Sequence, residues 1–597
     1  MKTRNFSSKF VAGTGFVAVA LLFVLACAPA SFAAGSAGFK NGRPAHGMFS
    51  KDLNYKQGKN NMVDVIVQYR VTPNTKHYSR MASRGALVKR RLHGIRAAAF
   101  HIPASMVQQL ENDPDVLYVT PDRPVQLTSV AYEPYNAAVM ATAAAQQYAF
   151  DGTGVGIAVI DSGVSDHPDL HNASGASRIV YSQSFVTGNT STADAYGHGT
   201  HVAGILAGNG ASSGSGSGYS AQFKGIAPNA NIINLRVLDQ NGCGTDSAVI
   251  AAIQQAIALK DQYNIKVINI SLGRPVYESY TLDPLDQAVE QAWQAGIVVV
   301  VAAGNSGRDN SLHTKGFATI AAPGNDPSVI TVGATRTFNS NSRADDAIAS
   351  YSSKGPTLVD HIVKPDIVAP GNRVVSLLVG GSTLDTQDHS LEVGPDACPL
   401  LSNCKTKYFR LSGTSMATPI VSGAVALMMQ QDSTLSPDTV KARLMKTAWK
   451  SFGTYCSSFD IFNNLYNNQY DMFTYGAGYL DVDSALSSSD VANGAALSPT
   501  VSYNPNTRTI SIQNTTSSVV AKSVIWGNSV IWGASVVWGG SVISANSVIW
   551  GNSVIWGDSV VWGDNSNQGF SVIWGDSVIW GSGIATSAYS DGQDGEN

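Results

Sequence analysis

The chain has 597 residues, which is too many for one compact hydrophobic core, so we expect at least two domains. Its formal net charge is −3, and the lack of a basic excess argues against a nucleic-acid-binding protein. Glycine is abundant at 57 residues, whereas charged residues make up 14% of the chain, a composition that favours an exported, loop-rich α/β protein over a cytosolic one.

The first 33 residues have the pattern of an export signal. Basic residues precede a short apolar run over 16–28, and Ser31-Phe32-Ala33 resembles a small-x-small cleavage site. A membrane anchor is less favoured because the apolar run is too short to span a bilayer. Lipidation at Cys27 is a minor alternative, since the residues before it match a lipobox only loosely. We therefore predict a secreted or cell-surface protein.

Residues 59–128 have the pattern of a small α+β unit. Apolar and β-branched runs predict strands over 64–69, 97–102 and 116–119, and helices are predicted over 76–91 and 103–111. On these residues alone the unit could be an independent binding domain.

Short apolar runs alternate with helical patterns from residue 154 onward. Strands are predicted over 155–160, 231–238, 267–270, 297–302 and 329–332, and helices over 199–207, 247–260 and 285–295. Continuous apolar strands between helices predict the α/β class, with a mostly parallel central sheet covered by helices on both faces. Active sites of such sheets lie at the carboxyl ends of the strands, where Asp161 and Asn305 follow apolar runs.

The tail differs in kind. From Ser523 it repeats a hexapeptide of the form Ser-Val-Ile-Trp-Gly-Asn/Asp, and eight of the ten tryptophans lie there. An even repeat keeps each side chain on one face of a strand, and Gly-Asn or Gly-Asp favours a turn. We expect short strands joined by tight turns, in a meander or a β-solenoid. Such an array could contact a surface or a polymer, or it could be purely structural.

Three segments carry the candidate chemistry, in the order acid, imidazole, hydroxyl. Asp161 stands in residues 157–163, His198 in 198–204 and Ser415 in 413–419. A serine hydroxyl is a weak nucleophile unless an oriented base removes its proton. Ser415 also begins a helix predicted over 416–430, whose N-terminal dipole favours developing negative charge.

The order of these three residues, together with their neighbours, resembles the subtilisin-like (S8) serine peptidases over roughly residues 135–486. The resemblance implies that Ser415 is the nucleophile, His198 the general base and Asp161 the residue that orients it. It also implies that Asn305, in Val-Ala-Ala-Gly-Asn-Ser-Gly, is an oxyanion-hole donor.

Other polar residues near these motifs are assigned lesser parts. His201 would be structural, and no metal site is predicted with His198 because a His-Glu-x-x-His pattern is missing. Asp166 and Asp194 are interpreted as exposed loop residues.

The resemblance also implies which residues contact a polypeptide substrate. The walls of the primary specificity pocket would be Ser271, Leu272, Gly273, Ala302, Ala303 and Gly304. The segment 241–244, with Gly242, would pair with extended substrate as an added strand. Arg274 stands where the family usually has Gly, and Cys243 lies on the binding edge, so the preference beyond the first pocket stays open.

No cofactor is required by this interpretation. Calcium is common in the family, but the insert over 208–223 is rich in Gly and Ser and has no carboxylate, so the usual loop site is not predicted, and weak calcium binding elsewhere stays open. Removal of the signal would leave Cys243, Cys398, Cys404 and Cys456, an even number that favours disulfides. Cys398 with Cys404 is the first choice, and three connectivities stay open.

Residues 59–128, which precede the peptidase-like region, resemble the inhibitor-like (I9) propeptide of many such enzymes. The resemblance rests on the phrase from residue 102 to residue 122. The predicted domains are a signal peptide (1–33), a linker (34–58), a propeptide (59–128), a peptidase domain (135–486), a second linker (487–520), the repeats (521–582) and a polar tail (583–597).

We interpret the chain as a secreted serine endopeptidase that acts on polypeptides through an acyl-enzyme. It would be made as a zymogen, inhibited by its own propeptide and self-cleaved between about residues 126 and 141. Two alternatives stay open. One is a binding or scaffold protein with a vestigial catalytic fold, and the other is a processing enzyme with a narrow target.

Overall fold

The computed structural model describes residues 48–50, 52–53, 62–126, 139–219, 221–311, 314–338, 343, 345–395, 406–452, 455–459 and 464–504. It also describes the backbone of a few short strands, at 39–40, 43–44, 509–512, 571–574 and 577–581. The predicted signal peptide and most of the repeats lie outside these residues. Within the described part of the chain, no helix has both the length and the apolar character needed to cross a membrane.

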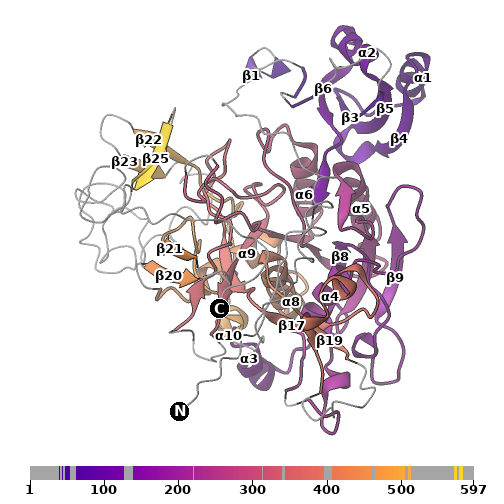
Figure 1. Ribbon diagram of the computed structural model, residues 1–597. Coiled ribbons are helices and arrows are strands. Elements are labelled where there is room, and N and C mark those ends of the chain that lie inside the picture. The colour runs from indigo at the N-terminus through magenta and orange to yellow at the C-terminus, as the bar shows by residue number, and fades with distance from the viewer. Residues whose placement is uncertain are drawn as a thin grey trace, which may run out of the picture. The chain divides into compact units, whose positions relative to one another are not determined.

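A mostly parallel sheet forms the centre of the structure (Figure 1). Its eight strands run in the order β15-β14-β13-β12-β8-β10-β9, with β16 beside β14, and the β14–β15 pair is antiparallel. The strands are β8 (Gly156–Asp161), β9 (Ile179–Ser184), β10 (Asn231–Arg236), β12 (Ile265–Ile270), β13 (Val298–Ala302), β14 (Ile330–Arg336), β15 (Ala347–Ile348) and β16 (Ile367–Pro370). Every residue of β8 and β13 is buried, which confirms the predicted α/β class with a sheet covered on both faces.

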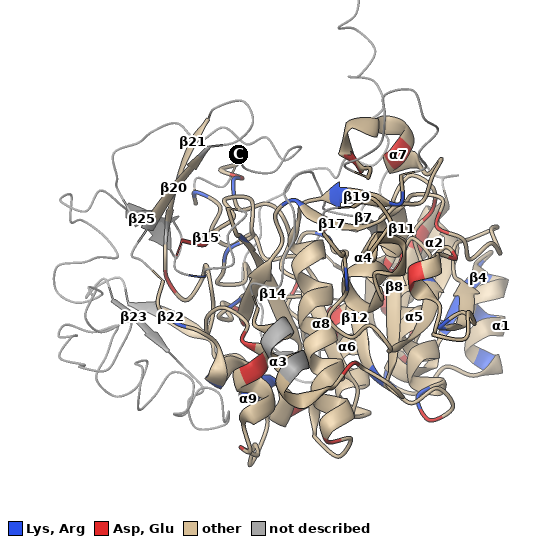
Figure 2. Ribbon diagram, turned by 90° about the horizontal axis from the view of Figure 1, so that it is seen from below, with Lys and Arg blue, Asp and Glu red and all other residues tan. Residues whose placement is uncertain are grey.

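Two pairs of helices lie against this sheet (Figure 1). Helix α4 (His198–Ala207) packs on α8 (Thr414–Gln431), and α5 (Asp246–Ala258) packs on α6 (Pro284–Gln294). Helix α8 contains no charged residue (Figure 2), and it is buried from Thr414 to Met429. A helix that is apolar on all sides belongs in the interior, so α8 packs across β12, β13 and β14 while it also contacts α4.

Smaller elements complete the larger part of the chain. They are α3 (Ala141–Tyr148), β17 (Val374–Leu377), α7 (Thr383–Gln387), β18 (Glu392–Val393), β19 (Tyr408–Leu411), α9 (Pro437–Thr447), β20 (Tyr455–Phe459), β21 (Leu465–Gln469), α10 (Val482–Ser487), β22 (Val501–Asn504) and β23 (Thr509–Ile512), with 3-10 turns at Pro168–Leu170, Ala211–Ser213 and His389–Leu391. Packing continues into the expected linker after residue 486, because Ala496 and Ser498 are buried and Lys441 donates a hydrogen bond to the Ser498 hydroxyl (2.9 Å).

An antiparallel sheet of order β4-β5-β3-β6 organises the N-terminal unit, by which we mean the described residues between 48 and 126. Its elements are β3 (Met62–Tyr69), α1 (Thr75–Ser83), β4 (Leu87–Leu92), a 3-10 turn at His93–Ile95, β5 (Ala97–Pro103), α2 (Ala104–Val107), a 3-10 turn at Gln108–Asn112, β6 (Val116–Pro121) and β7 (Pro124–Gln126). Met48 and Leu53, in the expected first linker, are buried in the core of this unit.

The helix predicted over 76–91 is wrong beyond Ser83. Gly85 adopts a left-handed conformation (φ +79°), which ends α1 and turns the chain back on itself. The basic residues that follow form β4, which pairs with β5 from Leu87 opposite His101 to Leu92 opposite Ala97. Sheet pairing with β5 outweighs the helical pattern of this segment.

Two successive hexapeptide repeats are described at the backbone level. Strand β24 (Ser571–Trp574) pairs antiparallel with β25 (Ser577–Gly581). The residues between these two strands and the remaining repeats lie outside the described residues, so the predicted array of strands and tight turns stays a prediction.

Close contact of α8 with its surroundings depends on Gly423. A Cβ at this position would lie 2.5 Å from the Cβ of Ile226, and neither group can move freely in a packed core. We predict that Gly423→Ala lowers the free energy of unfolding by about 1–3 kcal/mol. Urea unfolding of the Ser415→Ala chain, with and without the substitution, measures the effect. The double change Gly423→Ala, Ile226→Gly removes the Cβ that would clash, so it should cost less than the sum of the single changes, and strict additivity would contradict the proposed clash.

Candidate active site

Asp161 and His198 form a buried pair where β8 ends and α4 begins. The His198 Nδ1 lies 2.9 Å from Asp161 Oδ1 and 3.1 Å from Oδ2, and both side chains are fully buried. Close approach of α4 to β8 requires Gly199, since a Cβ there would lie 2.2 Å from the Gly163 carbonyl oxygen. Nδ1 faces the carboxylate, and Nε2 has no hydrogen-bond partner among the described residues, because the Ser415 hydroxyl donates to the Ser271 carbonyl oxygen instead.

The start of α4 is held by Asp194, which sequence reasoning wrongly treated as an exposed loop residue. Asp194 is 1% exposed, and its carboxylate accepts from the backbone N–H groups of Gly197 (2.7 Å) and Thr200 (2.7 Å) and from the Ser162 hydroxyl (2.8 Å). It therefore caps the helix that carries His198 and ties that helix to the residue after Asp161. An acid a few residues before a helical start was the signal that could have identified it. Asp166 is exposed, as expected.

Ser415 lies in the first turn of α8 and is fully buried. Its hydroxyl donates to the Ser271 carbonyl oxygen (3.0 Å), and the Ser271 hydroxyl donates to the Ser415 carbonyl oxygen (3.0 Å). The second bond exists because Pro419, four residues on, has no N–H to donate to that carbonyl within the helix. Pro419 thus frees a backbone group of Ser415 to anchor the residue to the end of β12.

Asn305 lies just beyond β13 and is only partly buried. Its Oδ1 accepts from the backbone N–H (2.9 Å) and the hydroxyl (2.9 Å) of Thr414, and that hydroxyl also accepts from the Gly304 N–H (3.1 Å). Because Oδ1 is held by the residue before Ser415, the amide offers its Nδ2 as a donor beside Ser415. Thr414, which sequence reasoning did not single out, sets this orientation.

Three adjacent strand ends bring these residues together. In the sheet register Ile160 of β8 lies beside Ile270 of β12, and Ile270 lies beside Val301 of β13. Asp161, Ser271 and the segment leading to Asn305 therefore follow one another along the carboxyl edge of the sheet, and Ser415 is bonded to the middle one. The four residues expected to act together thus meet at one edge.

The segment expected to pair with extended substrate, with Gly242 and Cys243, lies beside a strand of the N-terminal unit. Strand β11 (Cys243–Thr245) is antiparallel to β7, with Cys243 opposite Gln126 and Thr245 opposite Pro124. Gly242 has φ +74°, and a Cβ there would lie 2.9 Å from the Tyr196 ring. The occupant of this edge is the end of the N-terminal unit.

The small residues expected to form the pocket walls lie in two segments at the carboxyl ends of the neighbouring strands β12 and β13. They are Ser271, Leu272, Gly273, Ala302, Ala303 and Gly304, and all six are buried. A Cβ on Gly273 would lie 2.8 Å from the Ala322 carbonyl oxygen, and Gly304 has φ +103°. Glycine is therefore required at both positions, by space at the first and by backbone conformation at the second.

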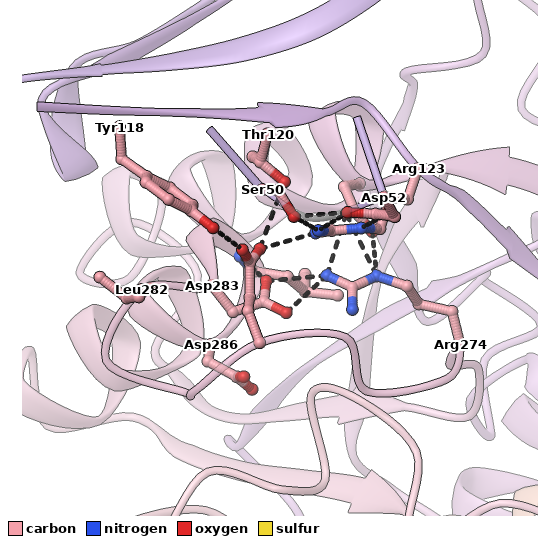
Figure 3. Close-up of polar contacts among 12 residues, drawn as sticks. Ser50, Asp52, Tyr118, Thr120, Arg123, Arg274, Leu282, Asp283 and Asp286 are labelled. Carbon is pink, nitrogen blue, oxygen red and sulfur yellow. Dashed lines mark hydrogen bonds and ion pairs between the residues drawn. The ribbon is translucent and has the colours of Figure 1, made fainter. Parts of the chain in front are cut away.

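Arg274, where the sequence departs from the family pattern, is a buried ion-pair centre rather than a side chain in the cleft (Figure 3). Its Nη2 lies 2.7 Å from Asp283 and 3.1 Å from Asp246. Burial opposes the charge, but the two carboxylates raise the pKa of Arg274 above its ordinary value. Arg274 therefore joins the pocket wall to the first residue of α5 and to the N-cap of α6.

His201 is fully buried on α4 and faces two backbone carbonyl oxygens, those of Phe409 (3.0 Å) and Val374 (3.2 Å) from its Nε2. Burial, together with the nearby His198, lowers the pKa of His201 to about 3. Because the Nε2–H group of the neutral ring donates to these carbonyl oxygens, we interpret His201 as a structural residue and not as a metal ligand.

One group among the described residues has the geometry to hold a cation, namely Asp385, His389 and Glu392. His389 Nδ1 lies 2.9 Å from Glu392 Oε1 and 3.2 Å from Asp385 Oδ1. The hydrogen bonds with Glu392 and then Asp385 raise the pKa of His389. They therefore favour the protonated ring, whereas a metal ion would need the neutral ring as its ligand. The disulfide predicted between Cys398 and Cys404 lies outside the described residues.

Comparison with known proteins gives consistent matches. A model of the subtilase family, Peptidase_S8, matches residues 152–478. Serine protease AprX of Bacillus subtilis is 43% identical over 302 residues, which is 49% of this chain and 61% of AprX. Subtilisin E of the same species is 33% identical over 412 residues, which is 68% of this chain and 84% of subtilisin E.

A similar fold occurs in the crystal structure of fervidolysin from Fervidobacterium pennivorans, described as a keratinolytic enzyme related to subtilisin. The two structures superpose with a TM-score of 0.54 at 22% identity, over 75% of this chain and 64% of the other. The chain thus spans less than two thirds of AprX and of fervidolysin.

Protonation of His201 should link stability to pH. The folded protein keeps this ring neutral down to a pKa of about 3, whereas the unfolded chain binds a proton below about 6.5. Stability is therefore lost as the pH falls from about 6.5 towards 3, and the loss between pH 7.5 and pH 5 should be about 2 kcal/mol. Urea unfolding of the Ser415→Ala chain at both pH values, beside the same chain with His201→Gln, measures it. Equal pH dependence in the two chains would contradict the assignment.

Proposed function

The chain belongs to the subtilase family of serine peptidases, and from this premise we propose that it hydrolyses polypeptides internally through an acyl-enzyme formed on Ser415. The family assignment confirms the sequence-based prediction of a subtilisin-like serine peptidase. The observation that best supports the proposed chemistry is the buried Asp161–His198 pair beside the strand end to which Ser415 is bonded.

In the proposed reaction His198 acts as general base. Its Nε2 takes the proton from the Ser415 hydroxyl, which turns away from the Ser271 carbonyl oxygen as it attacks the scissile carbonyl. Asp161 holds the imidazole by Nδ1 and stabilises the imidazolium that forms. The same Nε2 then gives its proton to the leaving amine, and water repeats the sequence to release the acyl group.

The oxyanion of the tetrahedral intermediate would be stabilised by two donors. One is the Nδ2 of Asn305, which Thr414 orients through Oδ1. The other is the Ser415 N–H, one of the first-turn N–H groups of α8 that lack an intrahelical partner. The dipole of α8 adds to the effect, because its positive end lies at Ser415.

Substrate would bind in extended form along β11. This edge already pairs with the antiparallel strand β7 through backbone hydrogen bonds. Such bonds do not depend on the side chains of the paired strand and therefore give no sequence selectivity. Selectivity would then come from the small-walled pocket between the 271–273 and 302–304 segments. Calcium is not needed for any of these steps.

The N-terminal unit would act as an intramolecular inhibitor. Its β7 occupies the substrate edge, and Asp122, two residues before β7, accepts from the N–H (2.8 Å) and the hydroxyl (2.6 Å) of Ser247 in the first turn of α5. Self-cleavage after Gln126 and before about residue 141 would free this edge. The export signal implies that this occurs during or after secretion, and the repeats would contact a surface or a polymer.

Replacement of the nucleophile tests the proposal directly. We predict that Ser415→Ala abolishes labelling by an organophosphonate and leaves the secreted chain uncleaved, whereas the wild type is labelled and loses the residues before about 130. Intact mass and N-terminal sequencing measure both properties. Equal processing of the two proteins would mean that another protease cuts the chain, and loss of labelling is then the deciding result.

The oxyanion donor has a separate signature. In subtilisin, a member of the same family, loss of one such donor costs about 10²–10³ in kcat, and we predict a loss of this size for Asn305→Ala with little change in KM. Steady-state kinetics on a peptide substrate measures it. Asn264→Ala, at an exposed asparagine whose side chain donates to the Gly154 carbonyl oxygen, provides the control. A change in KM alone would contradict the assignment.

A further inference from the structure

Arg123 is the residue immediately before β7, the strand that pairs with β11 along the proposed substrate-binding edge. Its own carbonyl oxygen accepts from the Asp246 N–H (2.9 Å), so the backbone ladder between β7 and β11 extends to this residue. The position of Arg123 is therefore set by backbone bonds, which any polypeptide lying along β11 could make.

The side chain of Arg123 is buried between Ser50 and Asp52 of its own unit, to which its Nε and Nη2 donate, and a cradle formed by the loop between β12 and α6 (Figure 3). Its Nη1 donates to Glu278 Oε1 (2.8 Å), and its guanidinium carbon lies 5.3 Å from the centre of the Tyr277 ring. A carboxylate beside an aromatic face is suited to a guanidinium, which can form a directed ion pair and stack on the ring at the same time.

Every donor that the structure gives to the Glu278 carboxylate comes from the N-terminal unit. Besides Arg123, the Tyr118 hydroxyl (2.6 Å) and the Thr120 hydroxyl (3.2 Å) bond to it (Figure 3). Removal of that unit takes away all three donors. Glu278 would then be a carboxylate beside the substrate edge, with its aromatic neighbour still in place.

The charge around the cradle also favours a cation. Asp246 and Asp283 share the single guanidinium of Arg274, so without Arg123 the Glu278 carboxylate would have no cation within ion-pair distance among the described residues. Arg123 supplies the second cation, and its charge also acts on Asp283 across the cluster. An incoming basic side chain would replace it.

We propose that Tyr277 and Glu278 form a subsite of the processed enzyme for a basic side chain, with arginine preferred, at the substrate residue immediately before the strand that pairs with β11. The subsite rests on the proposed peptidase function and adds a selectivity outside the primary pocket. Arginine is preferred over lysine because its planar group can stack on Tyr277 while it donates to Glu278.

The test uses the processed wild-type enzyme and peptides copied from residues 122–143, which span the whole range proposed for self-cleavage, with a fluorophore and a quencher at the ends. The second position carries Arg, as in the chain, or Lys, Gln or Glu. We expect kcat/KM for the Arg peptide to exceed that for the Gln peptide by roughly 5- to 20-fold, with Lys between them and Glu lowest. High salt should reduce the ratio.

Substitutions of Glu278 and Tyr277 test whether these two residues cause the preference for Arg over Gln. Glu278→Gln should bring the Arg-to-Gln ratio to about 1, and Tyr277→Leu should lower it while removing the advantage of Arg over Lys. Asp261→Asn is the matched control, since this exposed carboxylate follows the far end of α5, about 20 Å from the cradle, and should leave the ratio unchanged.

The outcomes separate the subsite from the function on which it rests. Cleavage of all four peptides at equal kcat/KM by the wild type would overturn the subsite and leave the peptidase proposal standing. An Arg preference that survives in Glu278→Gln would also overturn it. Failure to cleave any peptide would contradict the peptidase function and the subsite together. The comparison on wild-type protein needs no variant to fold.

Discussion

Burial of the parallel sheet on both faces is the constraint on which the rest of the structure depends. Parallel strands need crossover helices, and these helices cover the sheet and begin where strands end. The carboxyl ends of β8, β12 and β13 therefore lie side by side, with the N-termini of α4 and α8 over them. Residues that are hundreds of positions apart, such as Asp161 and Ser415, are brought to one edge by this arrangement and not by local sequence.

Small local departures adapt that general arrangement to the proposed chemistry. Gly199 lets α4 approach β8 closely enough for His198 to reach Asp161. Pro419 withholds one helical hydrogen bond, and Ser271 uses the carbonyl that is left. Thr414 turns the Asn305 amide so that its donor side faces Ser415. Each of these effects comes from a single residue and depends on the residues that contact it in the tertiary structure.

Although the chain has few charged residues, a group of them is buried where the N-terminal unit meets the larger part of the chain. Arg123 and Arg274 lie among Glu278, Asp246 and Asp283, and every one of these charges has an opposite partner within ion-pair distance. Buried charges are costly unless they are paired in this way. The cluster joins the pocket wall, the first turn of α5 and the N-cap of α6, so substrate recognition and inhibition are proposed to share one electrostatic centre.

The sequence by itself determined the α/β class, the positions of β8, β10, β12 and β13 and of α4, α5, α6 and α8, and the identity of Asp161, His198, Asn305 and Ser415 as the candidate site. The class and the elements follow from periodicity, and the site residues follow from local motifs through their resemblance to the subtilisin-like peptidases. Both are properties of short segments. Tertiary structure alone decided the rest. Residues 87–92 became β4 because β5 offered an edge, and Arg274 paired with the carboxylates of Asp246 and Asp283. In each case the deciding partner lies elsewhere in the chain or across an element boundary, where neither periodicity nor spacing could indicate it.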